Sequence, residues 1–132
     1  MPRPPSAAGP AGVVVHLHSP AAVAVACLAD VDADDVLPPL TAYYAMRIGR
    51  LPLAAYAPPG SAELVAGVAA LAGRHHAVLL ANHGPVVAGT TLDAAVDAIE
   101  ELEATARLHL LLAGRPTRPL TAEQVAALRT RP

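Results

Sequence analysis

The stretch VVVHLHSPAAVAVACLA, residues 13–29, predicts a strand followed directly by a helix. Residues 13–19 are rich in β-branched side chains, which favour a strand. Ser19 followed by Pro20 is typical of a helix start, with a capping side chain and then a proline in the first helical position. The apolar residues after Pro20 predict a short buried helix. We therefore expect the fold to begin with a strand that leads straight into a helix.

Two histidines stand at the end of this predicted strand. His16 and His18 are two residues apart, so in a strand their side chains share one face, with Cα atoms about 6.7 Å apart. Two imidazoles at that spacing can reach one ion at about 2.0–2.1 Å each. Taken alone, such a pair is more often found on the surface or packed in the core than on a metal. A third ligand is needed before the pair indicates a site.

A third histidine ends another apolar run, AVLLANHG at residues 77–84. This run predicts a buried strand that ends at His83, and Gly84 would allow backbone to approach closely. If the two strand ends meet, His83 supplies a third nitrogen, and three histidines leave an open position on zinc, as in catalytic sites. The alternative is a buried histidine with an ordinary structural role and an ordinary turn glycine.

Helical and extended patterns alternate along the rest of the chain. Residues 37–60 contain five prolines and predict a loop, a helical turn near 43–46 and a short strand near 51–55. Residues 85–89 either extend the strand before them or pair with it. Three further helices are expected: one at 61–73, capped by Ser61 and ended by Gly73; one from Thr90 or Thr91 to Gly114; and one after the capping box of Thr121 and Gln124. Interleaved strands and helices indicate an α/β or α+β class.

The first twelve residues, MPRPPSAAGPAG, differ in composition from the rest. They are rich in Pro, Gly and Ala and predict a disordered or extended lead-in, with the folded domain at 13–132. They lack the apolar segment of a signal peptide, and no apolar run in the chain reaches the length of a membrane span. A single cysteine, Cys27, excludes an internal disulfide, and we expect it to be a buried, inert thiol. Cytoplasmic localisation is the default expectation.

The composition is unusually apolar and poor in aromatic residues. Of the 132 residues, 54% are hydrophobic, but there is no Phe or Trp and only three Tyr, so Ala, Val and Leu must form the core. A small domain this apolar indicates an oligomer or a domain that has lost a covering piece. The net charge of −2 and the lack of a basic block argue against nucleic acid as a partner.

Three stretches together resemble the class II aldolase/adducin family. They are VVVHLHSPAAVAVACLAD, LPPLTAYYAMRIGRLPLAAYAPPGS and AVLLANHGPVVAGTTLDAAVDAIEELEATARLHLLL, and their order and spacing fit from about Val13 onward. Within the family, the stretch LPPLTAYYAMRIGRLPL is most similar to the 3-oxo-tetronate 4-phosphate decarboxylases.

The resemblance implies a three-layer α/β/α sandwich around a mostly antiparallel sheet, truncated here at its N-terminus. It also implies a homo-oligomer, commonly a tetramer with active sites between subunits. The family's divalent metal, usually Zn²⁺, would be held by His16, His18 and His83. The implied function is a carbon–carbon lyase acting on a phosphorylated sugar acid through a metal-stabilised enediolate. The three histidines do not distinguish decarboxylation from aldol cleavage.

The segment before the first strand departs from the family pattern. Family enzymes carry a phosphate-binding loop and an acid/base carboxylate upstream, whereas residues 1–12 contain no Asp, Glu or Asn. We therefore expect low lyase activity, an apolar sheet surface left exposed, and marginal stability. Two alternatives stay open: a non-catalytic, adducin-like interaction module, and a reading frame that is truncated or begins at the wrong codon.

Other residues have weaker claims to a functional role. In related aldolases a tyrosine in the region of Tyr43 and Tyr44 donates a proton to the neighbouring subunit's site; packing in an interface is the alternative. Arg47 and Arg50 could hold an anionic substrate, although exposed surface arginines are the commoner case.

The remaining histidines are weaker candidates for metal binding. His75 and His76 follow a helix end and read as loop residues, and His109 reads as a surface or interface residue of a long helix.

Overall fold

The computed structural model describes residues 12–129, so the predicted lead-in lies, except for Gly12, outside the described residues. The elements within that range are β1 (Val13–His16), α1 (Pro20–Ala26), α2 (Ala42–Arg47), β2 (Leu53–Ala54), α3 (Ala62–Ala72), β3 (Ala77–Leu80), β4 (Gly84–Gly89), α4 (Leu92–Leu111) and α5 (Ala122–Arg129). Strands and helices alternate as the sequence predicts, and the α/β class is confirmed.

The strands form one mixed sheet in the order β1-β4-β3-β2. β4 is antiparallel to both β1 and β3, whereas β2 is parallel to β3. Residues 85–89 therefore pair with the preceding strand rather than extend it. The register places His16 opposite Val86 and Leu80 opposite Gly84, so the end of β1 lies next to the β3–β4 turn.

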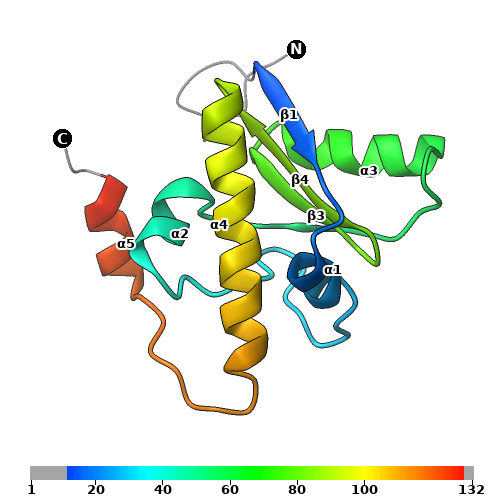
Figure 1. Cartoon of the computed structure of the whole chain (residues 1–132). Coiled ribbons are helices and arrows are strands. Elements are labelled where there is room, and N and C mark those ends of the chain that lie inside the picture. Colours follow the sequence, from blue (N-terminus) through cyan, green and yellow to red (C-terminus); the bar gives the residue numbers. More distant parts are fainter. Residues whose placement is uncertain (1–11, 130–132) are drawn as a thin grey trace.

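Helices cover both faces of this sheet. On one face, α3 packs Leu64, Val68 and Leu71 against a cluster that includes Val78 and Leu80. On the other face, α1, α2 and α4 cover the main core (Figure 1). The expected three-layer arrangement around a mostly antiparallel sheet is therefore present.

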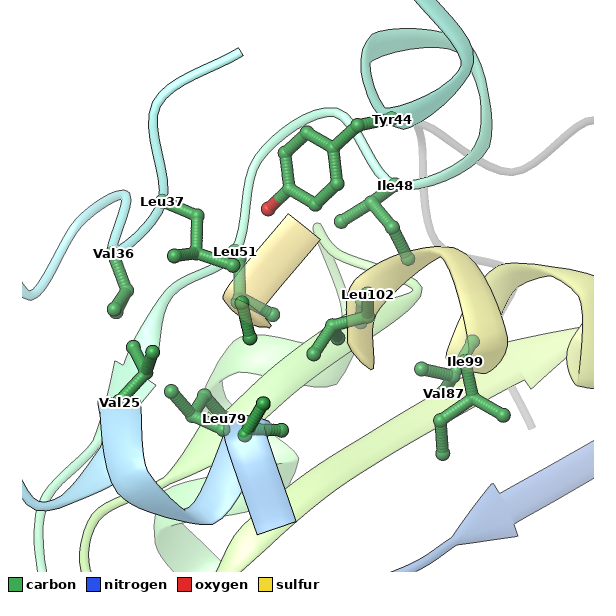
Figure 2. Close-up of a cluster of buried hydrophobic side chains, with 14 of the residues drawn as sticks. Val25, Val36, Leu37, Tyr44, Ile48, Leu51, Leu79, Val87, Ile99 and Leu102 are labelled. Carbon is green, nitrogen blue, oxygen red and sulfur yellow. The ribbon is translucent and has the colours of Figure 1, made fainter. Parts of the chain in front are cut away.

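The main core is built from small and branched aliphatic side chains, as the composition requires. Figure 2 shows Leu51, Leu79 and Leu102 between the sheet and the helices, with Tyr44 at one side of the cluster. Tyr44 is the one aromatic residue of this buried cluster, and its ring is fully buried. Because the side chains are small, the core depends on close approach of backbone segments.

The predicted strand at 13–19 is too long at its C-terminal end. β1 ends at His16, because the chain must turn to begin α1 at Pro20. The Leu17 N–H still donates to the Pro85 carbonyl at 3.4 Å, which continues the pairing with β4 for one step beyond the strand. His16 and His18 are therefore not both strand residues.

The prediction that Cys27 is buried is wrong. α1 is only seven residues long, and Cys27 is its C-terminal capping residue with an exposed side chain. The apolar pattern of residues 21–29 suggested a longer buried helix than the structure contains. No helix within residues 12–129 is both long and apolar enough to cross a membrane.

Candidate metal centre

Three histidines from two distant parts of the chain meet at one edge of the sheet. His16 is the last residue of β1, His18 lies between β1 and α1, and His83 lies in the turn between β3 and β4. The antiparallel pairing of β1 with β4 brings these segments together. From the sequence, His83 was expected to join His16 and His18 only if the two strand ends met. In the structure they do meet.

The ring nitrogens of these histidines face one another. His83 Nε2 lies 3.1 Å from His16 Nε2 and 3.1 Å from His18 Nε2. The candidate ligand atoms of all three residues lie within 4.8 Å of one another. For comparison, two ligands of a tetrahedral zinc ion at about 2.0–2.1 Å are about 3.3 Å apart. The spacing of the nitrogens suits a single ion between them.

The orientation of His16 is fixed by a backbone carbonyl. Its Nδ1 lies 2.8 Å from the carbonyl oxygen of Pro85, which can only accept a hydrogen bond. Nδ1 must therefore carry the proton, which leaves the Nε2 lone pair free to face the centre in the neutral ring. Such a contact is the usual way in which proteins fix the tautomer of a metal-binding histidine.

Hydrogen bonds among the three rings cannot satisfy all of these nitrogens. His83 Nε2 has two nitrogen neighbours but carries at most one proton, so it can donate to only one of them. A divalent ion would accept all three lone pairs at once. Burial lowers the pKa of His83, and the neighbouring His16 and His18 lower it further, which favours the neutral ring that binds metal. The donor set therefore fits zinc or a similar ion with one position left open.

Gly84 permits the close packing on which the cluster depends. Its φ is +155°, and a Cβ atom at this position would lie 2.5 Å from the carbonyl oxygen of Leu17. A side chain would therefore push the β3–β4 turn away from the segment that carries His18. The close backbone approach expected at this glycine is present.

Glu103 of α4 anchors the helix that follows His18, and it is a residue that the sequence analysis missed. Its Oε2 accepts the N–H of Ala21 at 3.0 Å, and its Oε1 accepts the N–H of Ala22 at 2.8 Å. Ser19 occupies the N-cap position, but its side chain makes no capping hydrogen bond, contrary to expectation. The carboxylate binds N–H groups more than 80 residues away in sequence, so no local motif indicates it.

The centre lies on the face of the sheet that α3 partly covers. His16 stands opposite Val86, whose side chain packs in the cluster under α3, so both point to that face. His16 and His18 are exposed and His83 is half-buried. On the same strand, Val14 is 57% exposed. The cluster is thus exposed on the surface, on the same face as the exposed apolar side chain of Val14.

The two tyrosines of the candidate region differ sharply in accessibility. Tyr44 is fully buried, and burial raises the pKa of its hydroxyl far above the ordinary value. Tyr43 is 60% exposed, with the guanidinium carbon of Arg47 5.2 Å from its ring centroid. Arg47 also forms an ion pair with Glu101 at 3.4 Å. Of the two tyrosines, only Tyr43 is placed to contact another molecule.

The remaining histidines do not join the cluster. His75 and His76 precede β3, whereas His83 follows it, so they lie at the other end of that strand. His76 Nε2 contacts the carbonyl oxygen of Arg47 at 2.7 Å. His109 is a half-buried residue in the last turn of α4. These positions agree with the expected loop placement of His75 and His76 and the helix placement of His109.

Comparison with known proteins identifies similar proteins of one family. A family model described as the Class II Aldolase and Adducin N-terminal domain matches residues 6–110. A 3-oxo-tetronate 4-phosphate decarboxylase of Pectobacterium atrosepticum is 49% identical over 115 residues, which are 87% of this chain and 53% of that enzyme. The chain thus spans about half the length of the curated relatives it matches.

Solved structures show the same fold. The crystal structure of YgbL from Escherichia coli superposes with a TM-score of 0.85 at 47% identity, covering 89% of this chain and 56% of that one. An L-fuculose-1-phosphate aldolase from Thermus thermophilus superposes with a TM-score of 0.61 at 29% identity, covering 76% of this chain and 53% of that one.

Proposed function

The chain belongs to the class II aldolase and adducin family, and from this premise we propose that it acts as a metal-dependent carbon–carbon lyase on a phosphorylated sugar acid. The proposed reaction is decarboxylation of a 3-oxo-tetronate 4-phosphate. Its support is the 49% identity to a relative that carries this name.

The observation that carries the proposal is the arrangement of His16, His18 and His83. The Nε2 atom of His83 lies 3.1 Å from that of each of the other two, and the Pro85 carbonyl sets the tautomer of His16. A pure interaction module has no need for three convergent imidazoles or for a carbonyl that orients one of them. The arrangement therefore favours chemistry over assembly.

These three residues would hold the metal, with zinc the first candidate. A bound divalent ion supplies an electrophile that accepts the negative charge left on the substrate carbonyl when a carbon–carbon bond breaks. The chain itself holds three nitrogens in place and leaves one side of the cluster open. Glu103 keeps α1 against α4 and so positions the segment that carries His18.

Metal titration tests the proposed centre. We expect about one zinc per chain by calorimetry and by metal analysis, and we expect His83→Ala to abolish it. His109→Ala is the matched control, because His109 lies on α4 outside the cluster, and it should bind zinc as the parent does. A folded parent that binds no zinc would contradict the proposal.

An activity assay separates the two lyase reactions. Release of CO₂ from 3-oxo-tetronate 4-phosphate would support decarboxylation, and loss of that activity in His83→Ala would tie it to the centre. The similarity to an L-fuculose-1-phosphate aldolase keeps aldol cleavage as the second candidate. Cleavage of a ketose 1-phosphate without any release of CO₂ would favour that candidate.

We also propose that the chain forms a homo-oligomer. A homo-oligomer would cover exposed apolar side chains such as Val14, Leu17 and Leu111, which are 57%, 45% and 69% exposed. Light scattering with and without a chelator tests this. Assembly that persists without metal, in a chain that also shows no lyase activity, would favour an adducin-like module.

A further inference from the structure

A cavity lies at the other end of the β3–β4 hairpin from the histidine cluster. It has a volume of about 620 Å³ and lies between the end of α2, the segment before β3, and α5. Its polar lining comes from Arg50, Arg74, Arg129, His75 and His76. Three of the nine arginines of a chain with net charge −2 therefore line one cavity.

The fold brings these arginines together from three parts of the chain. Gly49 has a φ of +73° and turns the chain after α2, so that Arg50 reaches the cavity. Arg129 comes from α5, and a Cβ atom on Gly49 would lie 3.6 Å from its Nη2. α5 packs beside α2 (Figure 1). The start of α5 is fixed by reciprocal hydrogen bonds between Thr121 and Gln124. The Arg129 guanidinium thus lies next to the glycine turn that precedes Arg50, and both residues line the cavity.

The described residues that line the cavity include three arginines and no carboxylate. Within residues 12–129, neither of the ion pairs found, Arg47–Glu101 and Arg107–Glu103, involves Arg50 or Arg129. An opposing charge comes from Asp35, which lines the adjoining cavity together with Arg50 and Arg129 and accepts the Leu51 N–H at 3.1 Å.

The pKa of His75 is lowered by its surroundings in the cavity. Burial lowers its pKa, and the charges of Arg74 and Arg50 lower it further, whereas Asp35 has a smaller opposite effect.

We propose that this cavity binds the phosphoryl group of a small phosphorylated metabolite, at a site separate from the histidine cluster. Guanidinium groups donate paired hydrogen bonds whose geometry matches phosphate oxygens. The volume lies within the range of about 300–1,000 Å³ that is usual for small-molecule sites. The two sites are separated by the length of β3, since His75 and His76 precede that strand and His83 follows it.

His75 offers a direct readout of a bound anion. In chelator-treated protein, its ring signals are followed by NMR through a pH titration, with inorganic phosphate and then with chloride at equal ionic strength. We expect phosphate to raise the pKa of His75 and to do so saturably, because a bound dianion offsets the nearby arginines. Glycerol 3-phosphate should act like inorganic phosphate, and acetate should act more weakly.

Substitutions of single arginines test whether phosphate binds in this cavity. Arg50→Gln and Arg129→Gln should each weaken phosphate binding by about tenfold, since each removes a charged hydrogen-bond donor. Arg115→Gln is the matched control, because Arg115 is an exposed arginine in the turn after α4, outside the cavity. Circular dichroism of each variant confirms that the fold is kept.

Three outcomes would overturn the proposal. They are a pKa of His75 that is the same in phosphate and in chloride, a loss of phosphate binding in Arg115→Gln as large as in the cavity variants, and binding of duplex DNA that is tighter than binding of phosphate. Because the protein is free of metal in this experiment, a negative result leaves the proposed lyase centre untouched, and a failed zinc titration leaves this site untouched.

Discussion

The carbonyl oxygen of Pro85 contacts two groups at the end of β1. It accepts Nδ1–H of His16 at 2.8 Å and the N–H of Leu17 at 3.4 Å. One atom therefore both orients a candidate ligand and aligns the backbone beside it. The sequence indicates which three histidines could meet, but the nitrogen that each presents depends on contacts such as this one, between residues 69 positions apart.

At the scale of single residues, Gly84 is the most sensitive position near the centre. Gly84→Ala should lower the free energy of unfolding by more than about 1 kcal/mol, because the new Cβ would meet the Leu17 carbonyl at 2.5 Å and φ is positive. Chemical denaturation measures this loss. Zinc affinity should fall with it, because the turn that carries His83 would move.

Gly73→Ala is the matched control for this change. Gly73 caps α3 with a φ of −68°, and nothing lies within 4 Å of a Cβ placed there. The substitution should change stability by less than about 1 kcal/mol, in the stabilising direction. If both alanine variants were equally stable, the close approach at Gly84 would not matter.

At the scale of elements, local capping explains most helix starts. Ser61, Thr91 and Thr121 each accept the backbone N–H three residues on, and all three starts were predictable from the sequence. α1 differs, because its first N–H groups bind Glu103 of a helix far along the chain. A motif within four residues is readable from sequence, whereas a cap supplied by packing requires the fold.

Glu103→Ala tests this packing contact. Removal of the carboxylate leaves two N–H groups of α1 without their acceptor, and we expect a loss of about 1–2 kcal/mol in the free energy of unfolding. Zinc binding should also weaken, because α1 begins just after His18. Glu100→Ala, on an exposed position of the same helix, should change neither property.

At the scale of the whole molecule, alternating strands and helices were enough to predict a layered α/β fold. The strand order and the register were not predictable, because the pairing of Val13 with Gly89 depends on packing across the whole chain. The exposure of Cys27 was not predictable for the same reason. The point at which α1 ends depends on the elements packed around the helix and not on the apolar sequence of the helix itself.

The core should be sensitive to the loss of a single large side chain. Leu102 is fully buried between α4 and the sheet (Figure 2), and Leu102→Ala should cost about 2–5 kcal/mol of stability. Leu111 lies on the same helix but is 69% exposed, so Leu111→Ala should be close to neutral. Urea denaturation of both variants checks the contrast; equal losses would place Leu102 outside the core.

Asp35 should make stability depend on pH. Burial raises its pKa above the ordinary value of 3.8, Asp32 raises it further, and the Leu51 N–H, Arg50 and His75 oppose the shift. A raised pKa in the folded state means that the contribution to stability is full below 3.8 and is lost as the pH rises through the raised value. Asp35→Asn should remove this dependence, measured by thermal unfolding from about pH 3 to about pH 7. An unchanged pH profile in the variant would contradict it.

The position of His83 in a hairpin sets an order of assembly. β3 and β4 are neighbours in sequence, so their turn can form early, whereas His16 must come from 67 residues away. Contacts between segments so far apart in sequence cost loop-closure entropy and generally form more slowly than local ones. We therefore expect the three imidazoles to come together late in folding. Zinc uptake by the nascent chain would report that β1 has docked, and a stalled or misfolded chain would present at most a part of the ligand set.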